Sequence, residues 1–184
     1  MPRQPRDAPV GQRLFFALWP DRPARAALAR LAQEIARDGQ GRAPRAVHLH
    51  VTLAFLAAVD EGHVPAVIEA GRAAAEDAEP FGLALERVGG NAYGVAWLTP
   101  HGVPAPLRAL HETLADRLRN AGFALERRMF RPHVTLARDC ARPAHRGSLP
   151  PIAWPVERLS LVASMLAPGG SQYREVESWP LRGR

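Results

Sequence analysis

The tetrapeptide His-Val-Thr-Leu occurs twice in this chain, beginning at His50 and again at His133. The two copies start 83 residues apart in a protein of 184 residues, and they contain two of its four threonines. A single match to so short a pattern arises easily by chance, but a second copy with the same residues in the same order does not. The repeat predicts a chain built from two related halves that each contribute one copy.

Each copy is typical of a β-strand, in which successive side chains point to opposite faces. His50 and Thr52 therefore share one face, while the apolar residues of the motif can be buried on the other. His133 and Thr135 repeat this arrangement in the second copy. Each strand is expected to present an imidazole and a hydroxyl on its accessible face, while the apolar side chains of its opposite face are buried in the core.

Two such strands facing one cleft provide the groups needed to cleave a phosphodiester without a metal. The ordinary pKa of histidine lies near neutrality, so one imidazole can accept a proton while the other donates one. Threonine hydroxyls can donate hydrogen bonds to phosphate oxygens. The alternative is a duplicated fold in which the two His–Thr pairs have only a structural role.

The residues around the motifs extend the pattern over nearly the whole chain. They read HLHVTLAFL at 48–56 and FRPHVTLAR at 130–138, with an opening segment RLFFALWP and a closing segment LAPGGSQYREVESWPL. This chain resembles the 2H phosphoesterase superfamily, and within it the RNA 2',3'-cyclic phosphodiesterases, also called 2'-5' RNA ligases. The resemblance implies an α+β fold of two lobes, with a pseudo-twofold pair of antiparallel-rich sheets, helices outside and a central cleft.

Hydrophobic periodicity and turn residues predict strands and helices that alternate in both halves. We expect one domain over residues 1–184 with two intertwined lobes, and a flexible tail at 1–11. The expected strands are 12–19, 49–59, 81–88, 93–98, 132–137, 156–166 and 173–179, the expected helices are 21–38, 64–75 and 104–120, and 142–151 is expected to be a loop rich in Pro, Gly and Arg.

The resemblance implies hydrolysis of 2',3'-cyclic phosphate ends of RNA or nucleotides to 2'-phosphates, with reversible 2'-5' RNA ligation as a related activity. We assign His50 as the general acid and His133 as the general base. Thr52, Thr135 and Arg138 are expected to bind the phosphate, although strict alternation turns Arg138 away unless the strand bulges or ends before it. The candidate contacts to the base or the rest of the substrate are Phe55, Phe130, Arg131, His48 and Tyr173; core packing is the competing interpretation for the aromatic ones.

No metal or cofactor is expected. His48 shares the face of His50, and with His133 it could form a three-histidine zinc site. Against this alternative, the second copy has Arg131 in the place of His48, and no neighbouring Cys, Asp or Glu completes a cluster. The other histidines, His63, His101, His111 and His145, are expected to be exposed to solvent.

Composition favours a compact domain that binds polyanions. The chain is 47% hydrophobic, its 24 basic residues are all arginine, and its formal net charge is +6. Arginine binds phosphate through paired hydrogen bonds, and Arg127, Arg128, Arg131 and Arg138 flank the second motif. No apolar run has the length of a membrane span, and with one cysteine, Cys140, no internal disulfide can form. We expect a cytoplasmic monomer whose partners are RNA with cyclic phosphate ends or cyclic nucleotides.

Other functions fit the same motifs. One is a different activity of this superfamily, such as opening a cyclic phosphate on an ADP-ribose derivative or trimming an RNA 3' end. Another is a noncatalytic module that binds nucleotides or RNA in the same cleft. Two intact histidines favour catalysis, because binding alone does not require two titrating groups.

Overall fold

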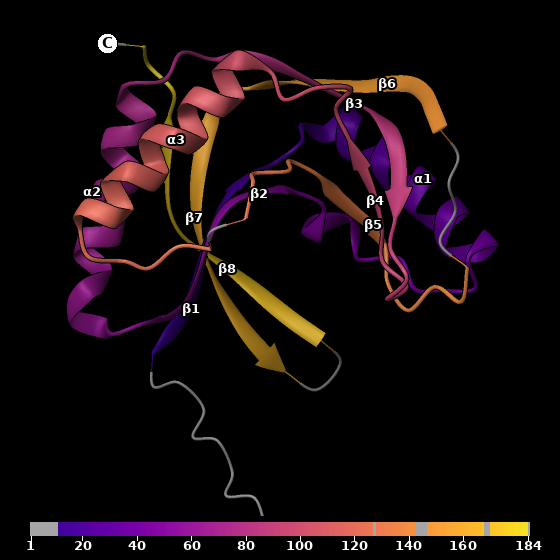
Figure 1. The fold of residues 1–184 in the computed structure, drawn as a ribbon, viewed down its shortest axis with the longest axis horizontal. Helices are drawn as coiled ribbons and strands as arrows, with labels where there is room; N and C mark the ends of the chain where they lie inside the picture. Colours follow the sequence, from indigo (N-terminus) through magenta and orange to yellow (C-terminus); the bar gives the residue numbers. More distant parts are fainter. Residues whose placement is uncertain (1–10, 127, 143–146, 168–169, 184) are drawn as a thin grey trace, which may run out of the picture.

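A computed structural model describes residues 11–126, 128–142, 147–167 and 170–183. Within these residues the chain forms three α-helices and one eight-stranded sheet with the order β6-β3-β4-β5-β2-β1-β7-β8 (Figure 1). All neighbouring strands in this sheet are antiparallel. The α+β fold expected from the sequence is confirmed.

The sheet divides into two lobes of four strands each. The first lobe contains β2 (Val51–Val59), β1 (Gln12–Leu18), β7 (Arg158–Ala167) and β8 (Gly170–Pro180). The second contains β5 (Val134–Ala137), β4 (Ala96–Thr99), β3 (Phe81–Gly90) and β6 (Gly147–Val156). The lobes join through β2 and β5, which pair at one position, Val51 with Val134.

The helices cross between the lobes. Helix α1 (Arg22–Asp38) follows β1 of the first lobe but packs on β5 and β6 of the second. Helix α3 (Ala105–Asn120) follows β4 of the second lobe but packs on α2 (Val64–Glu76) and β2 of the first (Figure 1). The chain thus exchanges a helix between the lobes in each half, so the two halves of the sequence are intertwined.

Helix α1 shows how local sequence determines these elements. The Asp21 carboxylate accepts a hydrogen bond from the Ala24 amide at 2.9 Å and so caps the helix amino terminus. Leu28, Leu31 and Ile35 then recur at helical spacing and are buried against the sheet. All three predicted helices form, within a few residues of the expected boundaries.

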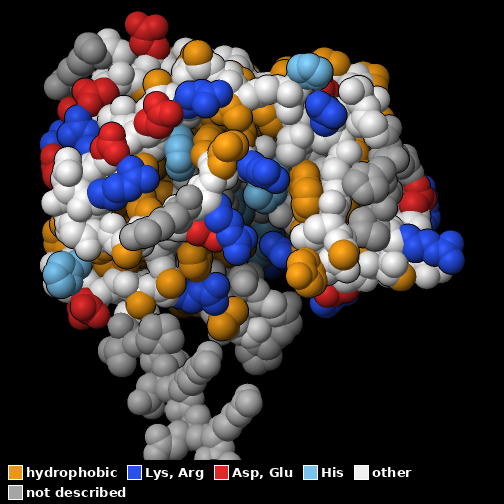
Figure 2. Space-filling model, viewed as in Figure 1, with side chains coloured by type: hydrophobic (Ala, Val, Ile, Leu, Met, Phe, Trp, Pro, Cys, Tyr) orange, Lys and Arg blue, Asp and Glu red, His pale blue; other side chains and the backbone are white. Residues whose placement is uncertain are grey.

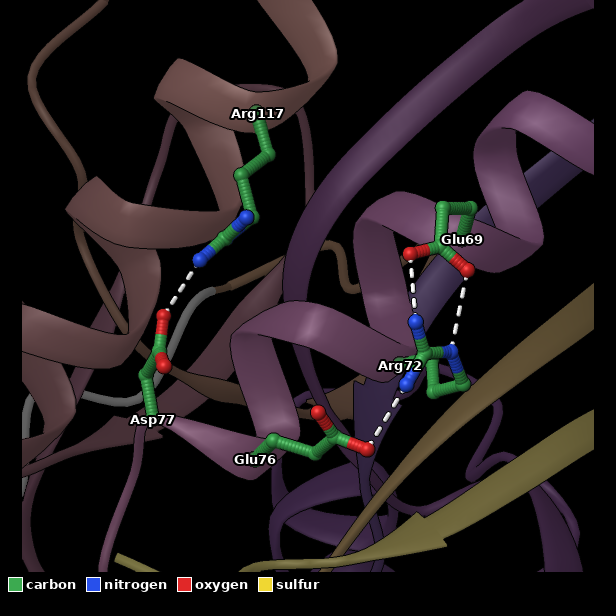
Figure 3. Close-up of polar contacts among 5 residues, drawn as sticks. All are labelled: Glu69, Arg72, Glu76, Asp77 and Arg117. Atoms are coloured by element: carbon green, nitrogen blue, oxygen red, sulfur yellow. Dashed lines mark hydrogen bonds and ion pairs between the residues drawn. The ribbon is translucent and has the colours of Figure 1, made fainter. Parts of the chain in front are cut away.

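Ion pairs on the outer surface connect helices α2 and α3 (Figure 3). Arg117 of α3 pairs with Asp77, the residue that follows α2. Within α2, Arg72 donates to Glu69 at 2.9 Å and to Glu76 at 2.7 Å. Because exposed ion pairs contribute little, the buried apolar faces of the two helices account for most of their packing energy.

The second half of the predicted loop at 142–151 is wrong, since residues 147–151 belong to β6, whereas 143–146 lie outside the described residues. Pro150 and Pro151 led to the prediction of a loop, because proline lacks the amide hydrogen that a central strand requires. Strand β6 lies at the edge of the sheet and pairs with β3 alone, where an edge strand tolerates proline. The predicted strands at 156–166 and 173–179 correspond to β7 and β8.

Each motif strand carries a β-bulge just after its threonine. On β2, Thr52 pairs with Ala17 and Ala54 with Phe16, so Leu53 is an extra residue. On β5, Thr135 pairs with Trp97 and Ala137 with Ala96, so Leu136 is the extra residue. The lobes therefore repeat their motif and also the backbone irregularity that follows it.

The main hydrophobic core runs through both lobes, from Leu14 and Phe16 on β1 to Leu83 and Leu85 on β3. None of the described helices combines the length and apolar character needed to cross a bilayer. A single domain over residues 1–184 remains a prediction, and the expected tail at 1–11 lies outside the described residues except for Gly11.

Candidate active site

The two motifs converge where the lobes meet. Pairing of Val51 with Val134 places the residues immediately before and after them opposite one another in the antiparallel register. His50 therefore lies across from Thr135, and Thr52 across from His133. Val51 and Val134 are fully buried behind this face, as the alternation of the sequence predicts.

Both histidines are oriented by the same kind of backbone contact. His50 Nδ1 lies 2.7 Å from the His48 carbonyl oxygen, and His133 Nδ1 lies 2.8 Å from the Arg131 carbonyl oxygen. A carbonyl oxygen can only accept, so each Nδ1 carries a hydrogen and donates it. This fixes the ring orientation and leaves Nε2 of both rings as the atom that can exchange protons with a substrate.

The surroundings of the two rings differ. His50 is half-buried among aromatic rings, with centroids 4.9 Å from Phe15, 5.0 Å from Trp19 and 5.6 Å from Tyr173. His133 is exposed, with the Trp97 ring 6.2 Å away. The motifs are thus alike in sequence, but the two histidines differ in their environment.

Burial dominates the electrostatics of His50. Desolvation, partly opposed by the Nδ1 hydrogen bond to the His48 carbonyl, lowers the pKa of His50, and with the smaller contributions of the positive charges of His48, His133 and Arg138 this pKa is about 4. The neutral form accordingly prevails near neutral pH in the empty site. Because Nδ1 holds the hydrogen, Nε2 accepts the hydroxyl hydrogen of Thr52 at 3.0 Å.

Arg138 directly follows the bulge and the last residue of β5. The extra residue at Leu136 shifts the alternation by one position, and β5 ends at Ala137, as the assignment of Arg138 to the phosphate required. Arg138 is exposed, its charge lowers the pKa of His50, and it forms no ion pair within the described residues. An exposed guanidinium whose charge acts on His50 is available to an anion.

Contacts on the neighbouring loop hold the backbone of Arg138 in place. The amide of Arg138 donates to the Arg42 carbonyl at 3.0 Å, and the amide of Arg42 donates back at 2.8 Å. The next residue, Asp139, has a left-handed backbone with φ of 56°, and its carboxylate accepts from Arg42 Nε at 2.9 Å. The loop before the first motif thus supports the arginine that follows the second.

The other candidate contacts have different surroundings. Phe55 is 44% exposed on the cleft face, and the Arg13 guanidinium lies 5.4 Å from its ring centroid. His48 is half-buried with its ring 4.5 Å from that of Tyr173. Arg131 is exposed, and Phe130 is half-buried against the core.

Of the arginines expected to flank the second motif, Arg128 forms an ion pair and Arg127 is not described. Arg128 pairs with Glu126 at 3.0 Å. Arg127 and His145 lie outside the described residues. Among the residues that the structure places, no group of three His, Cys, Asp or Glu side chains is arranged to hold a metal ion.

Sequence reasoning missed several residues at this site. Phe15, Trp19 and Trp97 line it although none belongs to a motif, and alternation along RLFFALW could have placed Phe15 and Trp19 on one face of β1. The predicted exposure of His111 is wrong, because this side chain is half-buried and bonded to the backbone of β2. His63 and His101 are exposed, as predicted.

The molecular surface shows the site as a recess. Figure 2 shows a hollow near the centre of this face, with histidine side chains inside it and arginine and hydrophobic side chains around its mouth. A recess with basic groups, titrating groups and aromatic rings suits an anionic ligand that also carries flat apolar surfaces.

Comparisons with known proteins agree with this arrangement. A family model described as the 2'-5' RNA ligase superfamily matches residues 19–165. An RNA 2',3'-cyclic phosphodiesterase of Thermus thermophilus is 35% identical over 93% of this chain and 91% of the relative. The enzyme of that name from Escherichia coli is 32% identical over 92% of this chain and 97% of the relative.

Solved structures show the same fold. The crystal structure of Escherichia coli LigT complexed with 3'-AMP has a TM-score of 0.81 and 28% sequence identity. The match covers 92% of this chain and 98% of that protein. On its fold, its duplicated motifs and the family model that spans most of its length, this chain belongs to the 2'-5' RNA ligase superfamily.

Proposed function

We propose that this protein hydrolyses 2',3'-cyclic phosphate ends of RNA or nucleotides to 2'-phosphates by metal-independent acid–base catalysis. The observation that carries the proposal is the convergence of two His–Thr pairs at Val51 and Val134, with Nδ1 of each imidazole bonded to a carbonyl oxygen. Relatives that bear the name RNA 2',3'-cyclic phosphodiesterase support the choice of substrate.

The reaction places the two histidines on opposite sides of the phosphorus. His133 Nε2 accepts a proton from water as the water oxygen attacks phosphorus. The bond from phosphorus to the 3' oxygen breaks, and His50 Nε2 donates a proton to that oxygen. The 2' oxygen stays bonded to phosphorus, so the product is a 2'-phosphate.

The threonines and Arg138 stabilise the charge that develops on the nonbridging oxygens. In the empty site the Thr52 hydroxyl donates to Nε2 of His50. When that nitrogen is protonated it can no longer accept, so the Thr52 hydroxyl is released to donate to the phosphate. Protonation of the acid and binding of the anion are therefore coupled.

The same groups serve 2'-5' RNA ligation. A 5' hydroxyl of another RNA end takes the place of water, and His133 accepts its proton. The 3' oxygen again leaves with a proton from His50, and the result is a 2'-5' linkage. Cleavage of this linkage back to the cyclic phosphate runs with the histidine roles exchanged.

Substrate contacts beyond the phosphate fall to exposed rings and basic groups on the cleft face. We assign binding of the nucleobase to the Phe55 ring. This ring is exposed and lies near Arg13, and both features favour stacking on a nucleobase. Tyr173 lies beside the His50 ring and His48 beside Tyr173, and Arg131 is exposed two residues before His133. We assign the remaining substrate contacts to these three residues.

The function is tested with a 2',3'-cyclic mononucleotide and an oligonucleotide that ends in a cyclic phosphate, both in the presence of EDTA. We expect turnover of both, undiminished by the chelator, and a 2'-phosphate product identified by chromatography against 2' and 3' standards. A 3'-phosphate product contradicts the proposed order of bond breaking. Turnover only of a cyclic phosphate on ADP-ribose, or only trimming of RNA 3' ends, points to another activity of the superfamily.

Binding of a phosphate monoester should raise the pKa of His50. The empty site holds this pKa at about 4, so His50 can act as the acid only when an anion offsets burial and the nearby positive charges. We expect an upward shift of at least about one unit in the complex with a 2'-nucleotide, because opposite charge within a few ångströms favours the protonated ring. Histidine NMR titrations with and without the nucleotide measure it, with His50→Gln used to assign the resonance. An unchanged pKa of His50 in the complex would contradict its assignment as the acid and would favour His50 as the base and His133 as the acid.

A further inference from the structure

His111 lies outside both motifs, yet it contacts the strand that carries the first of them. It is half-buried on α3, and its Nδ1 lies 3.0 Å from the Leu53 carbonyl oxygen. Because the carbonyl can only accept, the imidazole donates this hydrogen bond. The contact ties α3 to the residue that directly follows Thr52.

The backbone of β2 is irregular at the residue that His111 holds. Leu53 is the extra residue of the bulge against β1, and pairing of β2 with β5 is limited to Val51. Leu53 is itself buried. A buried carbonyl without a partner costs free energy, so the side chain of His111 supplies a donor where the sheet is disrupted.

The other side of His111 contacts the segment that leads into the second motif. The rings of His111 and Phe130 are stacked, with centroids 3.9 Å apart and planes inclined by 7°. Phe130 is followed by Arg131, whose carbonyl oxygen accepts from His133 Nδ1 at 2.8 Å. The stack therefore fixes the backbone one residue before the group that orients His133.

We propose that His111 is a positioning residue that holds the two catalytic histidines in their mutual arrangement, through Leu53 on the His50 side and Phe130 on the His133 side. The proposal rests on the proposed function for its effect on catalysis. Every step along this path is a bonded neighbour, a hydrogen bond or a ring contact. Since β2 and β5 pair at a single position, the contacts of His111 add to the Arg42–Arg138 hydrogen bonds and further restrict movement of one histidine relative to the other.

The state of the His111 ring is consistent with this role. Burial, opposed by the hydrogen bond to Leu53, lowers the pKa of His111. A neutral ring stacks on Phe130 without the desolvation cost of a charge, and Nδ1 remains a donor. The contacts of His111 run to Leu53 and Phe130, so its effect on the catalytic histidines passes through these residues.

The first experiment compares His111→Ala with His101→Ala, the same substitution at an exposed histidine. We expect kcat for the cyclic phosphate to fall about 10- to 100-fold in His111→Ala, since a displacement of roughly 1 Å at reacting groups costs that much. The KM should change little, because the groups that bind the phosphate remain. His101→Ala should match the parent in kcat and KM. A folded His111→Ala protein with kcat within about twofold of the parent overturns the proposal.

Two conservative variants separate the links and guard against a variant that fails to fold. His111→Asn keeps a donor near Nδ1 but removes the stacking ring, and His111→Phe keeps the ring but removes the donor. Each is expected to retain more kcat than His111→Ala. If neither does so while circular dichroism shows native folding and melting, neither the donor nor the ring supports catalysis by itself and the proposal is wrong.

Hydrogen–deuterium exchange provides a measure that does not depend on activity. In His111→Ala we expect faster exchange in residues 128–133 and around Leu53, and unchanged exchange in α1 of the opposite lobe. Unchanged exchange in both of those segments overturns the positioning role even if the parent enzyme is active. If the parent protein hydrolyses no cyclic phosphate, the proposed function is wrong. Faster exchange in His111→Ala would still support the structural link through His111 in that case.

Discussion

His50→Ala and His133→Ala should each lower kcat for a 2',3'-cyclic phosphate by about 10²- to 10⁴-fold, the range that a positioned acid or base contributes. His50→Ala removes the ring whose Nε2 would protonate the 3' oxygen. His133→Ala removes the exposed ring opposite it, whose Nε2 would accept the proton of water. Each substitution leaves Thr52, Thr135 and Arg138 in place, so substrate binding should survive better than turnover.

The two losses should not add. Acid and base act in the same transition state, so the double variant is expected to be little worse than the poorer single variant. Steady-state kinetics on the four proteins measure this, with His101→Ala as the matched control at an exposed position. Turnover retained in either single variant would rule out a mechanism with two histidines.

Arg138→Met should reduce kcat/KM about 10²-fold or more, the loss typical of removing one preorganised donor to a developing negative charge. Arg138→Lys keeps the charge but not the paired donors, so an intermediate value is expected. Arg108→Met removes the same charge from the exposed face of α3 and should leave the kinetics unchanged. Equal effects of Arg138→Met and Arg108→Met would show that only net charge matters.

The arginine variant has a second readout that requires no substrate. The charge of Arg138 contributes to the low pKa of His50, so Arg138→Met should raise that pKa in the empty site. Arg108→Met should not. An NMR titration of the His50 ring distinguishes the two variants. An unaltered pKa of His50 in Arg138→Met would show that the guanidinium lies too far from His50 for both groups to contact the same substrate phosphate.

The sequence predicts which side chains share a face of each motif strand, because successive side chains alternate between the two faces of every β-strand. It placed His50 with Thr52 and His133 with Thr135, with buried valines behind them. Helical spacing likewise located all three α-helices. These predictions succeeded because they depend on residues near one another in the chain.

Features that depend on distant segments could not be predicted in this way. The bulges at Leu53 and Leu136 exist only relative to β1 and β4, so the side chain direction of Arg138 was undetermined. The site residue Trp97 is a neighbour of His133 only because β4 and β5 pair. Strand β6 was missed because proline content indicates a loop unless the strand is known to lie at an edge.

The exchange of helices between the lobes determines how the protein can be divided. A cut near the middle of the chain separates β2 and α2 from α3, which packs on both of them, and separates β5 from α1. Each fragment would then expose the apolar face of a half-sheet, so neither should fold when expressed alone. The fragments should regain structure only when mixed, and catalytic turnover in such a mixture would report their reassembly.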